Sequence, residues 1–170
     1  MGGADKGLVE YLNRPLIEWA MDAIRPQVGE VLISANRNPD VYARYGCRVL
    51  PDTLPGFPGP LAGVLAAMEA VTSDWLLVVP CDTPHLPADL ASRLFEAAQI
   101  AAKSSLAVAA DDARIHHTTM LVKCYLKQDL RQFLQEGGRA VRDWQARHVV
   151  ARARFEAAHF ANYNSLTDLE

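Results

Sequence analysis

The strongest constraint on the fold of this chain is a regular alternation between short apolar runs and segments with helical periodicity. The apolar runs are typical of buried strands and occupy residues 30–35, 47–50, 74–79, 105–110, 118–123 and 149–155. The helical segments occupy residues 15–25, 39–45, 61–71, 87–101 and 126–134, with further candidates at 139–148 and 165–170. Strands that alternate with helices predict a three-layer α/β fold with a mostly parallel sheet between two layers of helices.

Size and composition fit one globular domain. The chain has 170 residues, so we expect residues 1–170 to form a single domain. Half of the residues are hydrophobic and 22% are charged, which is enough apolar material for a core. The net charge of -3 argues against a nucleic-acid partner, and no apolar run approaches the roughly 20 residues that span a bilayer. The first residues lack the apolar region of a signal peptide, so we expect a cytoplasmic protein.

The first candidate for chemistry is Asp82, because ligands of α/β sheets bind beyond the carboxyl ends of the strands. It follows the most apolar run, 74–79, and lies between Pro80 and Pro84. A carboxylate in this position is suited to Mg²⁺, which prefers oxygen ligands and often shares its shell with substrate phosphates. A residue that closes the turn before the next helix is an equal alternative.

Four other residues gain weight only in combination. Asp52 follows the run 47–50 and is either a second carboxylate at the same rim or a turn residue. Gly59 and Gly63 flank the start of an alanine-rich helix, where the backbone can approach an anion or simply pack closely on the sheet. Lys6 precedes the first helix, where it could neutralise a triphosphate or be an ordinary surface lysine.

Other conspicuous residues are less specific. A cluster that includes Arg139 and Arg142 could recognise a phosphate group or form an exposed surface. His116 and His117 are adjacent on a predicted strand, so their side chains should point to opposite faces and not share a metal ion. The three cysteines are far apart, without metal-binding spacing and without the even number of a disulfide framework.

The order of the short motifs resembles that of molybdenum-cofactor guanylyltransferases along essentially the whole chain. The motifs are Asp5-Lys6-Gly7-Leu8, Asn13-Arg14-Pro15-Leu16, Ser34-Ala35-Asn36-Arg37, Pro51-Asp52, Gly59-Pro60-Leu61-Ala62-Gly63, Pro80-Cys81-Asp82-Thr83-Pro84 and Asn162-Tyr163-Asn164. The Pro-Cys-Asp-Thr-Pro and Gly-Pro-Leu-Ala-Gly stretches together are specific to that family and its close relatives.

The resemblance implies a nucleotide-diphosphosugar-transferase-like, Rossmann-like fold that binds GTP, Mg²⁺ and the molybdopterin cofactor. It places Lys6 on the GTP phosphates and makes Lys6 and Asp82 the catalytic pair. Asp82 would bind both metal and nucleotide. The nucleotide site would also include Ser34, Asp52, Gly59 and Gly63. The molybdopterin side would include Asn162, Asn164, Arg139 and Arg142. Molybdoenzyme apoproteins or their chaperones are the protein partners that the resemblance allows.

Three positions depart from the family pattern. Ser34 stands where the family usually has an asparagine, and His116-His117-Thr118 stands where it tends to have His-Pro-Thr. Family members also begin with an apolar strand and a glycine-rich loop, and Met1-Gly2-Gly3 corresponds to the end of that loop. We therefore expect a domain that lacks the first strand and most of the loop, with an apolar gap in the sheet. Such a domain should bind GTP more weakly than a longer form.

The implied reaction is attack of the terminal phosphate of molybdopterin on the α-phosphorus of GTP, which releases pyrophosphate and forms the guanine dinucleotide cofactor. Two alternatives stay open at this level. One is the same chemistry with another base or acceptor, as in molybdopterin cytidylyltransferases or sugar-phosphate nucleotidyltransferases. The other is a non-catalytic nucleotide-binding module, because the loop is missing.

Overall fold

A computed structural model describes residues 5–52, 59–101 and 104–161 of the chain. The α-helices are α1 (Leu16–Ile24), α2 (Pro39–Ala43), α3 (Pro60–Ala70), α4 (Leu90–Ile100), α5 (Lys127–Gln135) and α6 (Val141–Gln145). The strands are β1 (Glu10–Tyr11), β2 (Arg14–Pro15), β3 (Leu32–Ser34), β4 (Arg48–Leu50), β5 (Trp75–Val78), β6 (Leu106–Ala110), β7 (Ile115–Lys123) and β8 (Val150–Arg154). Short 3-10 helices complete the fold, namely η1 (Lys6–Leu8), η2 (Arg25–Gln27), η3 (Cys124–Leu126) and η4 (Ala157–Phe160).

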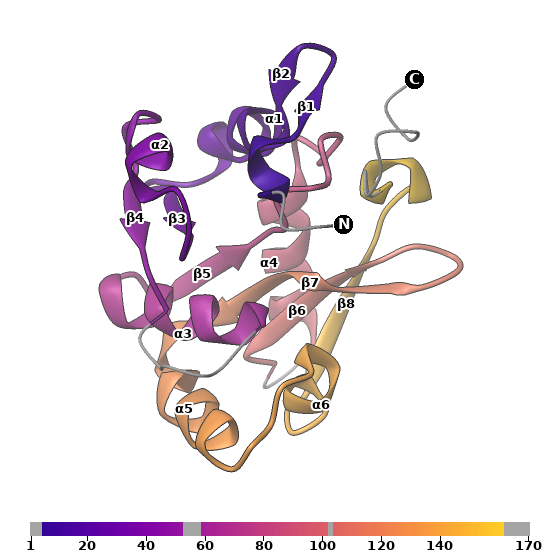
Figure 1. Cartoon of the computed structure of the whole chain (residues 1–170). Coiled ribbons are helices and arrows are strands. Elements are labelled where there is room, and N and C mark those ends of the chain that lie inside the picture. The colour runs from indigo at the N-terminus through magenta and orange to yellow at the C-terminus, as the bar shows by residue number, and fades with distance from the viewer. Residues whose placement is uncertain (1–4, 53–58, 102–103, 162–170) are drawn as a thin grey trace.

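The strands that the sequence predicts form two sheets (Figure 1). The larger sheet has the order β5-β7-β6-β8, and the smaller one pairs β3 with β4 in parallel. Strand β7 pairs antiparallel with both β5 and β6, whereas β6 and β8 are parallel. Strands β5, β6 and β8 therefore point the same way, and β7 alone is reversed in this sheet. The reversal follows from the connection, because β6 and β7 are joined by a tight turn and not by a helix.

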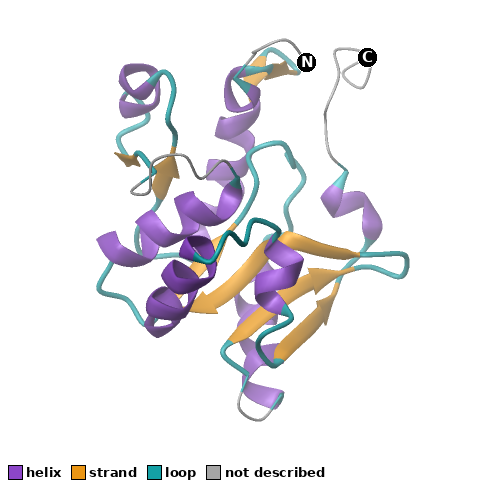
Figure 2. Cartoon of the chain, turned by 60° about the horizontal axis from the view of Figure 1, so that its bottom comes forward, coloured by secondary structure: helices purple, strands orange, loops and turns teal. Residues whose placement is uncertain are grey.

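Helices cover both faces of the four-stranded sheet, which confirms the three-layer α/β fold (Figure 2). On one face α3, α5 and α6 contribute to an apolar cluster that includes Leu65, Leu130 and Trp144. On the other face α1 and α4 contribute to a second cluster that includes Ala20 and Leu94. The middle strand β6 is buried along its whole length, which explains why its sequence is apolar at every position.

Most predicted segments form the predicted element, with ends that differ by a few residues. Helix α4 begins at Leu90, three residues after the predicted start at Pro87, and β7 begins at Ile115 and not at Thr118. The hairpin of β1 and β2 was not predicted, because its turn is made by Leu12 and Asn13 with φ values of 49° and 60°. Residues in left-handed conformations are usually glycine, so a turn that begins with leucine is difficult to predict from the sequence. The helix predicted at residues 165–170 lies outside the described residues.

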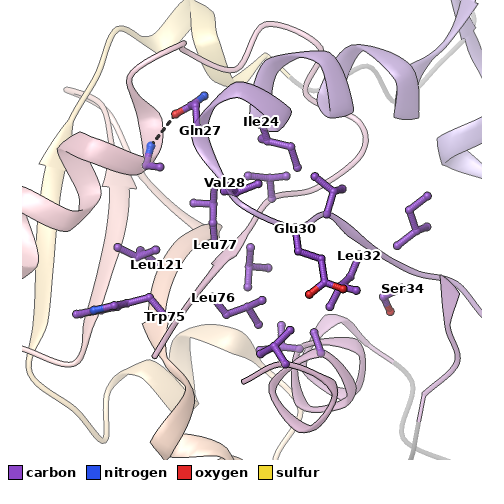
Figure 3. A pocket seen from close by; sticks show the side chains of 18 of the residues that line it. Ile24, Gln27, Val28, Glu30, Leu32, Ser34, Trp75, Leu76, Leu77 and Leu121 are labelled. Carbon is purple, nitrogen blue, oxygen red and sulfur yellow. Dashed lines mark hydrogen bonds between the residues drawn. The ribbon is translucent and has the colours of Figure 1, made fainter. Parts of the chain in front are cut away.

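The two sheets are separated by a cavity of about 840 Å³. Its lining includes Leu32 of β3 together with Leu76 and Leu77 of β5 (Figure 3). Among the described residues, β3 pairs only with β4 and β5 pairs only with β7, so the facing edges of β3 and β5 have no partner strand. The cavity between β3 and β5 is thus lined mostly by apolar side chains. No helix in the described part of the chain is long and apolar enough to cross a membrane.

The β6–β7 turn is organised by the carboxylate of Asp111. Its Oδ1 accepts hydrogen bonds from the backbone N–H groups of Ala113 at 2.7 Å and Arg114 at 2.8 Å. The Nε2 atom of His116 lies 2.8 Å from its Oδ2. These backbone N–H groups, followed by His116, lower the pKa of Asp111 from 3.8 to about 2. Because the charged form is favoured in the folded chain, this carboxylate contributes stability above its unfolded pKa.

We predict that Asp111→Asn lowers the melting temperature at neutral pH and flattens its dependence on acid. The amide can still accept a hydrogen bond but cannot titrate, so the stability that the wild type loses between about pH 4 and pH 2 has no counterpart in the variant. Thermal unfolding followed by circular dichroism over this pH range measures the difference. The exposed neighbour Asp112→Asn is the control, and equal pH slopes for wild type and Asp111→Asn would contradict the assignment.

Candidate active site

The candidate active site lies where the carboxyl ends of β3, β4 and β5 meet. Asn36 follows β3, Asp52 follows β4, and Asp82 follows β5. The segment of Asp5 and Lys6 connects these ends, since Asp5 bonds to residues after β3 and Lys6 bonds to Asp82. Polar side chains from four separate parts of the chain therefore gather at one rim of the fold, as expected for a ligand site of an α/β sheet.

Lys6 and Asp82 form the central ion pair of the rim. The Nζ atom of Lys6 lies 3.3 Å from Oδ2 of Asp82, and the exposed fractions of the two side chains are 49% and 12%. The loop that carries Asp82 is held by Thr83, whose buried hydroxyl donates to the carbonyl of Pro80 at 3.2 Å. A buried carboxylate paired with a half-exposed ammonium leaves positive charge accessible from solvent. That arrangement is suited to an anionic ligand.

The position of Lys6 is set by its neighbour Asp5. The hydroxyl of Tyr42 donates to Oδ1 of Asp5 at 2.5 Å, and Nδ2 of Asn38 donates to Oδ2 at 3.0 Å. Burial and the bond to Asp5 raise the pKa of Tyr42, so its phenol stays protonated and remains a donor. Gly7 packs under this ring, since a Cβ there would lie 2.6 Å from the Tyr42 oxygen. A buried tyrosine therefore fixes the segment that presents Lys6.

A second polar group surrounds Asp52. Its Oδ2 accepts a hydrogen bond from Nδ2 of Asn36 at 2.7 Å, and its backbone N–H donates to Oδ1 of Asn36 at 2.9 Å. This reciprocal pair joins the carboxyl ends of the parallel strands β3 and β4. A Cβ at Gly63 would lie 2.2 Å from Oγ of Ser34 and 3.6 Å from Oδ1 of Asp52. Gly63 therefore allows α3 to approach this group closely, as the sequence suggests.

The remaining predicted residues are distributed as follows. Gly59 precedes α3 with a φ of 130°, which favours glycine. Arg139 lies between α5 and α6, and Arg142 lies within α6. Both helices are at the bottom of Figure 1, whereas the β1–β2 hairpin is at the top. The structure thus does not bring the two arginines to the Lys6–Asp82 pair. Asn162 and Asn164 lie outside the described residues.

The histidines behave as their spacing predicts. His116 stacks on Phe160 with a centroid distance of 4.1 Å, and Nδ1 of His117 lies 2.5 Å from Oε1 of Gln145. Their neighbours belong to opposite faces of the sheet, so the two rings do not converge on one ion.

The buried carboxylate of Asp82 is the candidate metal ligand of the described part of the site. Among the described residues, no group of three or more histidine, cysteine, aspartate or glutamate side chains could hold a metal. Mg²⁺ often takes only one or two carboxylates and completes its shell with water and substrate phosphates. Asp82 fits this mode, in which the metal arrives with a phosphate-bearing ligand. Cys81 is no nucleophile here, because burial and the charge of Asp82 raise the pKa of its thiol to about 11.

Four residues of this rim carry contacts to which the sequence reasoning assigned no role, namely Asp5, Asn36, Asn38 and Tyr42. Asp5 and Asn36 belong to recognised motifs. Their partners, Tyr42 and Asp52, lie 37 and 16 positions away in the sequence, so no local sequence pattern predicts these contacts. The one usable signal was position, since Asn36 and Asn38 directly follow a predicted strand.

The sequence is similar to a known family over most of its length. The family model for MobA-like NTP transferase domains matches residues 1–153. The molybdenum cofactor guanylyltransferase of Shewanella pealeana is 46% identical over 167 residues, which cover 97% of this chain and 83% of that protein. The protein of the same name from Shewanella amazonensis is 45% identical over 172 residues, which cover 100% of this chain and 87% of the relative.

Solved structures confirm the fold class. Molybdopterin-guanine dinucleotide biosynthesis protein A from Archaeoglobus fulgidus superposes with a TM-score of 0.80 at 19% identity, covering 98% of this chain and 88% of that chain. The 2-C-methyl-D-erythritol 4-phosphate cytidylyltransferase of Thermus thermophilus gives 0.75 at 23% identity, covering 96% and 90%. At these identities the likeness concerns the fold alone.

We predict that Gly63→Ala lowers the free energy of unfolding by about 1–3 kcal/mol, because the new methyl group overpacks the contact between α3 and Ser34. Ser34→Ala removes the oxygen that lies 2.2 Å from the new Cβ and leaves the contact with Cβ of residue 34 at 3.0 Å. The double variant should therefore regain part, but not all, of the loss. Urea unfolding of the wild type, both single variants and the double variant measures the coupling, and purely additive effects would contradict the contact.

We also predict that Tyr42→Phe frees the segment around Lys6. Loss of the hydroxyl leaves the Asp5 carboxylate without its closest donor, which should cost about 1–3 kcal/mol of stability. Hydrogen exchange of the backbone amides of residues 7–9 should accelerate in the same variant. Tyr125→Phe is the control, because its phenol is exposed and belongs to another part of the surface. Unchanged exchange in Tyr42→Phe would show that Asp5 is held by other groups.

Proposed function

This chain belongs to the family of MobA-like NTP transferase domains, and we propose that it transfers GMP from GTP to the molybdopterin cofactor. The observation that carries this proposal is the extended match, at more than two fifths identity, to proteins named molybdenum cofactor guanylyltransferase. The Lys6–Asp82 pair at the carboxyl ends of the strands supplies the fitting chemistry. We infer that residues 1–170 act as one catalytic domain and that it works in the cytoplasm.

The transfer makes one phosphorus–oxygen bond and breaks another. An oxygen of the terminal phosphate of molybdopterin attacks the α-phosphorus of GTP. The bond from that phosphorus to the bridging oxygen of the β-phosphate breaks, and pyrophosphate leaves with the electron pair. Such a reaction needs little covalent help from the protein, because catalysis consists mostly of positioning and charge stabilisation.

In this scheme Lys6 contacts the GTP phosphates as a point charge. Its ammonium has three donors, so it can bind phosphate oxygen from the solvent side while it stays near Asp82. The bonds from Tyr42 and Asn38 to Asp5 hold the backbone beside it, which reduces the ordering that the lysine needs on binding.

Asp82 would hold Mg²⁺ together with the phosphates of the nucleotide. When bound, the ion neutralises charge on the phosphates and fixes their orientation. Asp82 itself is largely buried and lies on a loop held by Thr83, so its carboxylate is already oriented.

The group around Asp52 would bind the nucleoside part of GTP. Asn36 fixes the carboxylate of Asp52, and the absence of a side chain at Gly63 lets α3 pack closely against Ser34 beside it. Gly59 at the start of α3 would let the backbone pass near the substrate. Arg139, Arg142, Asn162 and Asn164 stay predictions for the molybdopterin side, as do molybdoenzyme apoproteins or their chaperones as recipients.

The direct test is pyrophosphate release with molybdopterin and either GTP, CTP or UTP. We expect release with GTP and Mg²⁺. In Asp82→Asn the rate should fall at least about 100-fold, which corresponds to about 2.7 kcal/mol of transition-state stabilisation. The substitution keeps the shape of the side chain and removes the charge that would hold the metal.

Two comparisons make this result specific. Asp89→Asn is the matched control, because its carboxylate is exposed and lies beyond the same loop, at the start of α4. Its rate should equal that of the wild type. Pyrophosphate release with CTP in preference to GTP would show that the enzyme uses cytosine and not guanine nucleotides. A wild-type rate for Asp82→Asn at saturating Mg²⁺ would show that Asp82 has no part in the mechanism.

A further inference from the structure

Strand β7 carries a bulge close to the hairpin that joins it to β6 (Figure 1). Val108 of β6 pairs with Met120. The next residue of β6, Ala109, pairs with His116, which lies four positions earlier in β7. Within the described part of the chain, residues 117–119 therefore have no Cα partner in β6 or β5. Bulges leave their extra residues unpaired, change the direction of a side chain and are frequent next to active sites.

The register places this bulge beside the loop that carries Asp82. Strand β5 ends at Val78, opposite Met120, and β7 runs antiparallel to it. The residues before Met120 therefore extend past the end of β5, in the direction in which the chain continues to Asp82. His117 lies up to about 10 Å further along β7, and neighbouring strands are about 4.8 Å apart. His117 and Asp82 thus belong to the same rim.

A buried glutamine fixes the ring of His117. Gln145 of α6 is 3% exposed, and its Nε2 donates to the backbone carbonyl of His117 at 2.9 Å. That carbonyl can only accept, so the amide nitrogen must face it and Oε1 of Gln145 must face the imidazole. Nδ1 of His117 lies 2.5 Å from Oε1, and it therefore carries a hydrogen and donates it.

The second ring nitrogen of His117, Nε2, is accessible. No described residue forms a hydrogen bond with it. In the described part of the chain every buried polar side-chain atom has a partner, so Nε2 is not buried. With Nδ1 as a donor, a neutral ring offers Nε2 as an acceptor and a protonated ring offers it as a second donor. A phosphate monoester also exchanges a proton near neutral pH, so each state of an imidazole has a matching state of the phosphate.

His117 lies on the face of the sheet that α3 covers. The amide of Gln145 contacts Sδ of Met120 at 3.3 Å, and Met120 belongs to the apolar cluster of α3, α5 and α6. The helix that approaches the group around Asp52 therefore also covers the face on which His117 lies.

The order of the strands gives each polar group its own place at the rim. The group around Asp52 follows β4, and the Lys6–Asp82 pair follows β5. His117 lies on β7, on the side of β5 away from β3. In the proposed function the first two groups would hold the nucleoside and the phosphates of GTP. The position on β7 is left for the second substrate.

We propose that Nε2 of His117 binds the terminal phosphate of the acceptor, and that Gln145 positions the ring for this contact. The proposal rests on the proposed function, to which it adds a residue for the second substrate. His117 would touch that substrate, whereas Gln145 would act only through His117. A bulge that turns a histidine toward the rim and a buried amide that fixes its tautomer support this role.

The kinetic test is His117→Asn, assayed by pyrophosphate release with GTP and molybdopterin. The asparagine amide can take the place of Nδ1 and keep the contact with Gln145, but it has no atom at the place of Nε2. The KM for molybdopterin should rise at least about 10-fold, and the KM for GTP should stay within about 2-fold of the wild type. His117→Gln should recover part of the loss, because its amide nitrogen can reach the place of Nε2.

Two further variants separate this role from a structural one. His148→Asn is the matched control, since His148 is also half-buried and bonded, to Asp129, but precedes β8 at the opposite end of the sheet. Both of its KM values should equal those of the wild type. Gln145→Met keeps the length of the side chain and removes both hydrogen bonds to His117. It should raise the KM for molybdopterin alone, and if it does not fold, His117→Asn decides the question.

A titration with inorganic phosphate tests the contact without turnover. In long-range ¹H–¹⁵N spectra at constant pH, the Nε2 signal of His117 should shift saturably and by more than its Nδ1 signal. The ring of His148 should not respond. Saturating GTP should leave the response of His117 in place, because the proposed phosphate belongs to the acceptor.

The outcomes separate this proposal from the proposed function. A wild type that releases no pyrophosphate with GTP would contradict the proposed function, and the phosphate titration alone would then decide whether His117 binds the anion. An active wild type with an unchanged KM for molybdopterin in His117→Asn would overturn the role of His117. A KM change confined to GTP, or a phosphate response that GTP abolishes, would assign Nε2 to the nucleotide and also overturn the proposal.

Discussion

The site depends on how the two sheets are held together, since no backbone hydrogen bond joins them among the residues that the structure describes. Helix α3 contributes Leu65 and Met68 to the core of the larger sheet, and at the same time Gly63 brings it against Ser34 at the end of β3. At the rim, Asp5 bonds to Asn38 and Tyr42 on the side of β3, and Lys6 bonds to Asp82 on the side of β5. Close packing and charged hydrogen bonds therefore hold the two sheets together, as strand pairing does in a continuous sheet.

This arrangement explains the division of the rim into two polar groups. The loop after β5 holds the Lys6–Asp82 pair, whereas the loops after β3 and β4 hold Asn36 and Asp52. In the proposed function the first group would provide charge for phosphates, whereas the second has a fixed carboxylate and a glycine beside it. A nucleotide with its phosphates on one group and its nucleoside on the other would lie across the ends of both sheets. The relative position of the sheets is then itself part of the binding geometry.

Much of the fold could be predicted because periodicity is a local property. The helical pattern of residues 126–134 and the apolar run 105–110 each identify an element without knowledge of its neighbours. The same reasoning failed at the β1–β2 turn, where Leu12 and Asn13 both adopt left-handed conformations, which asparagine tolerates but leucine rarely adopts. It also did not reveal that β7 is reversed, because strand direction depends on whether a connection packs back over the sheet.

The sequence by itself determined the α/β class, the family and the positions of Asp52 and Asp82 after their strands. These follow from the pattern of apolar residues and from the order of short motifs. Only the tertiary structure decided that Lys6 meets Asp82, 76 positions away, that Tyr42 and Asn38 fix the segment beside it, and that β3 and β5 face each other across a cavity. Contacts between distant residues depend on how whole elements pack, and packing is set by the shapes of all the side chains together.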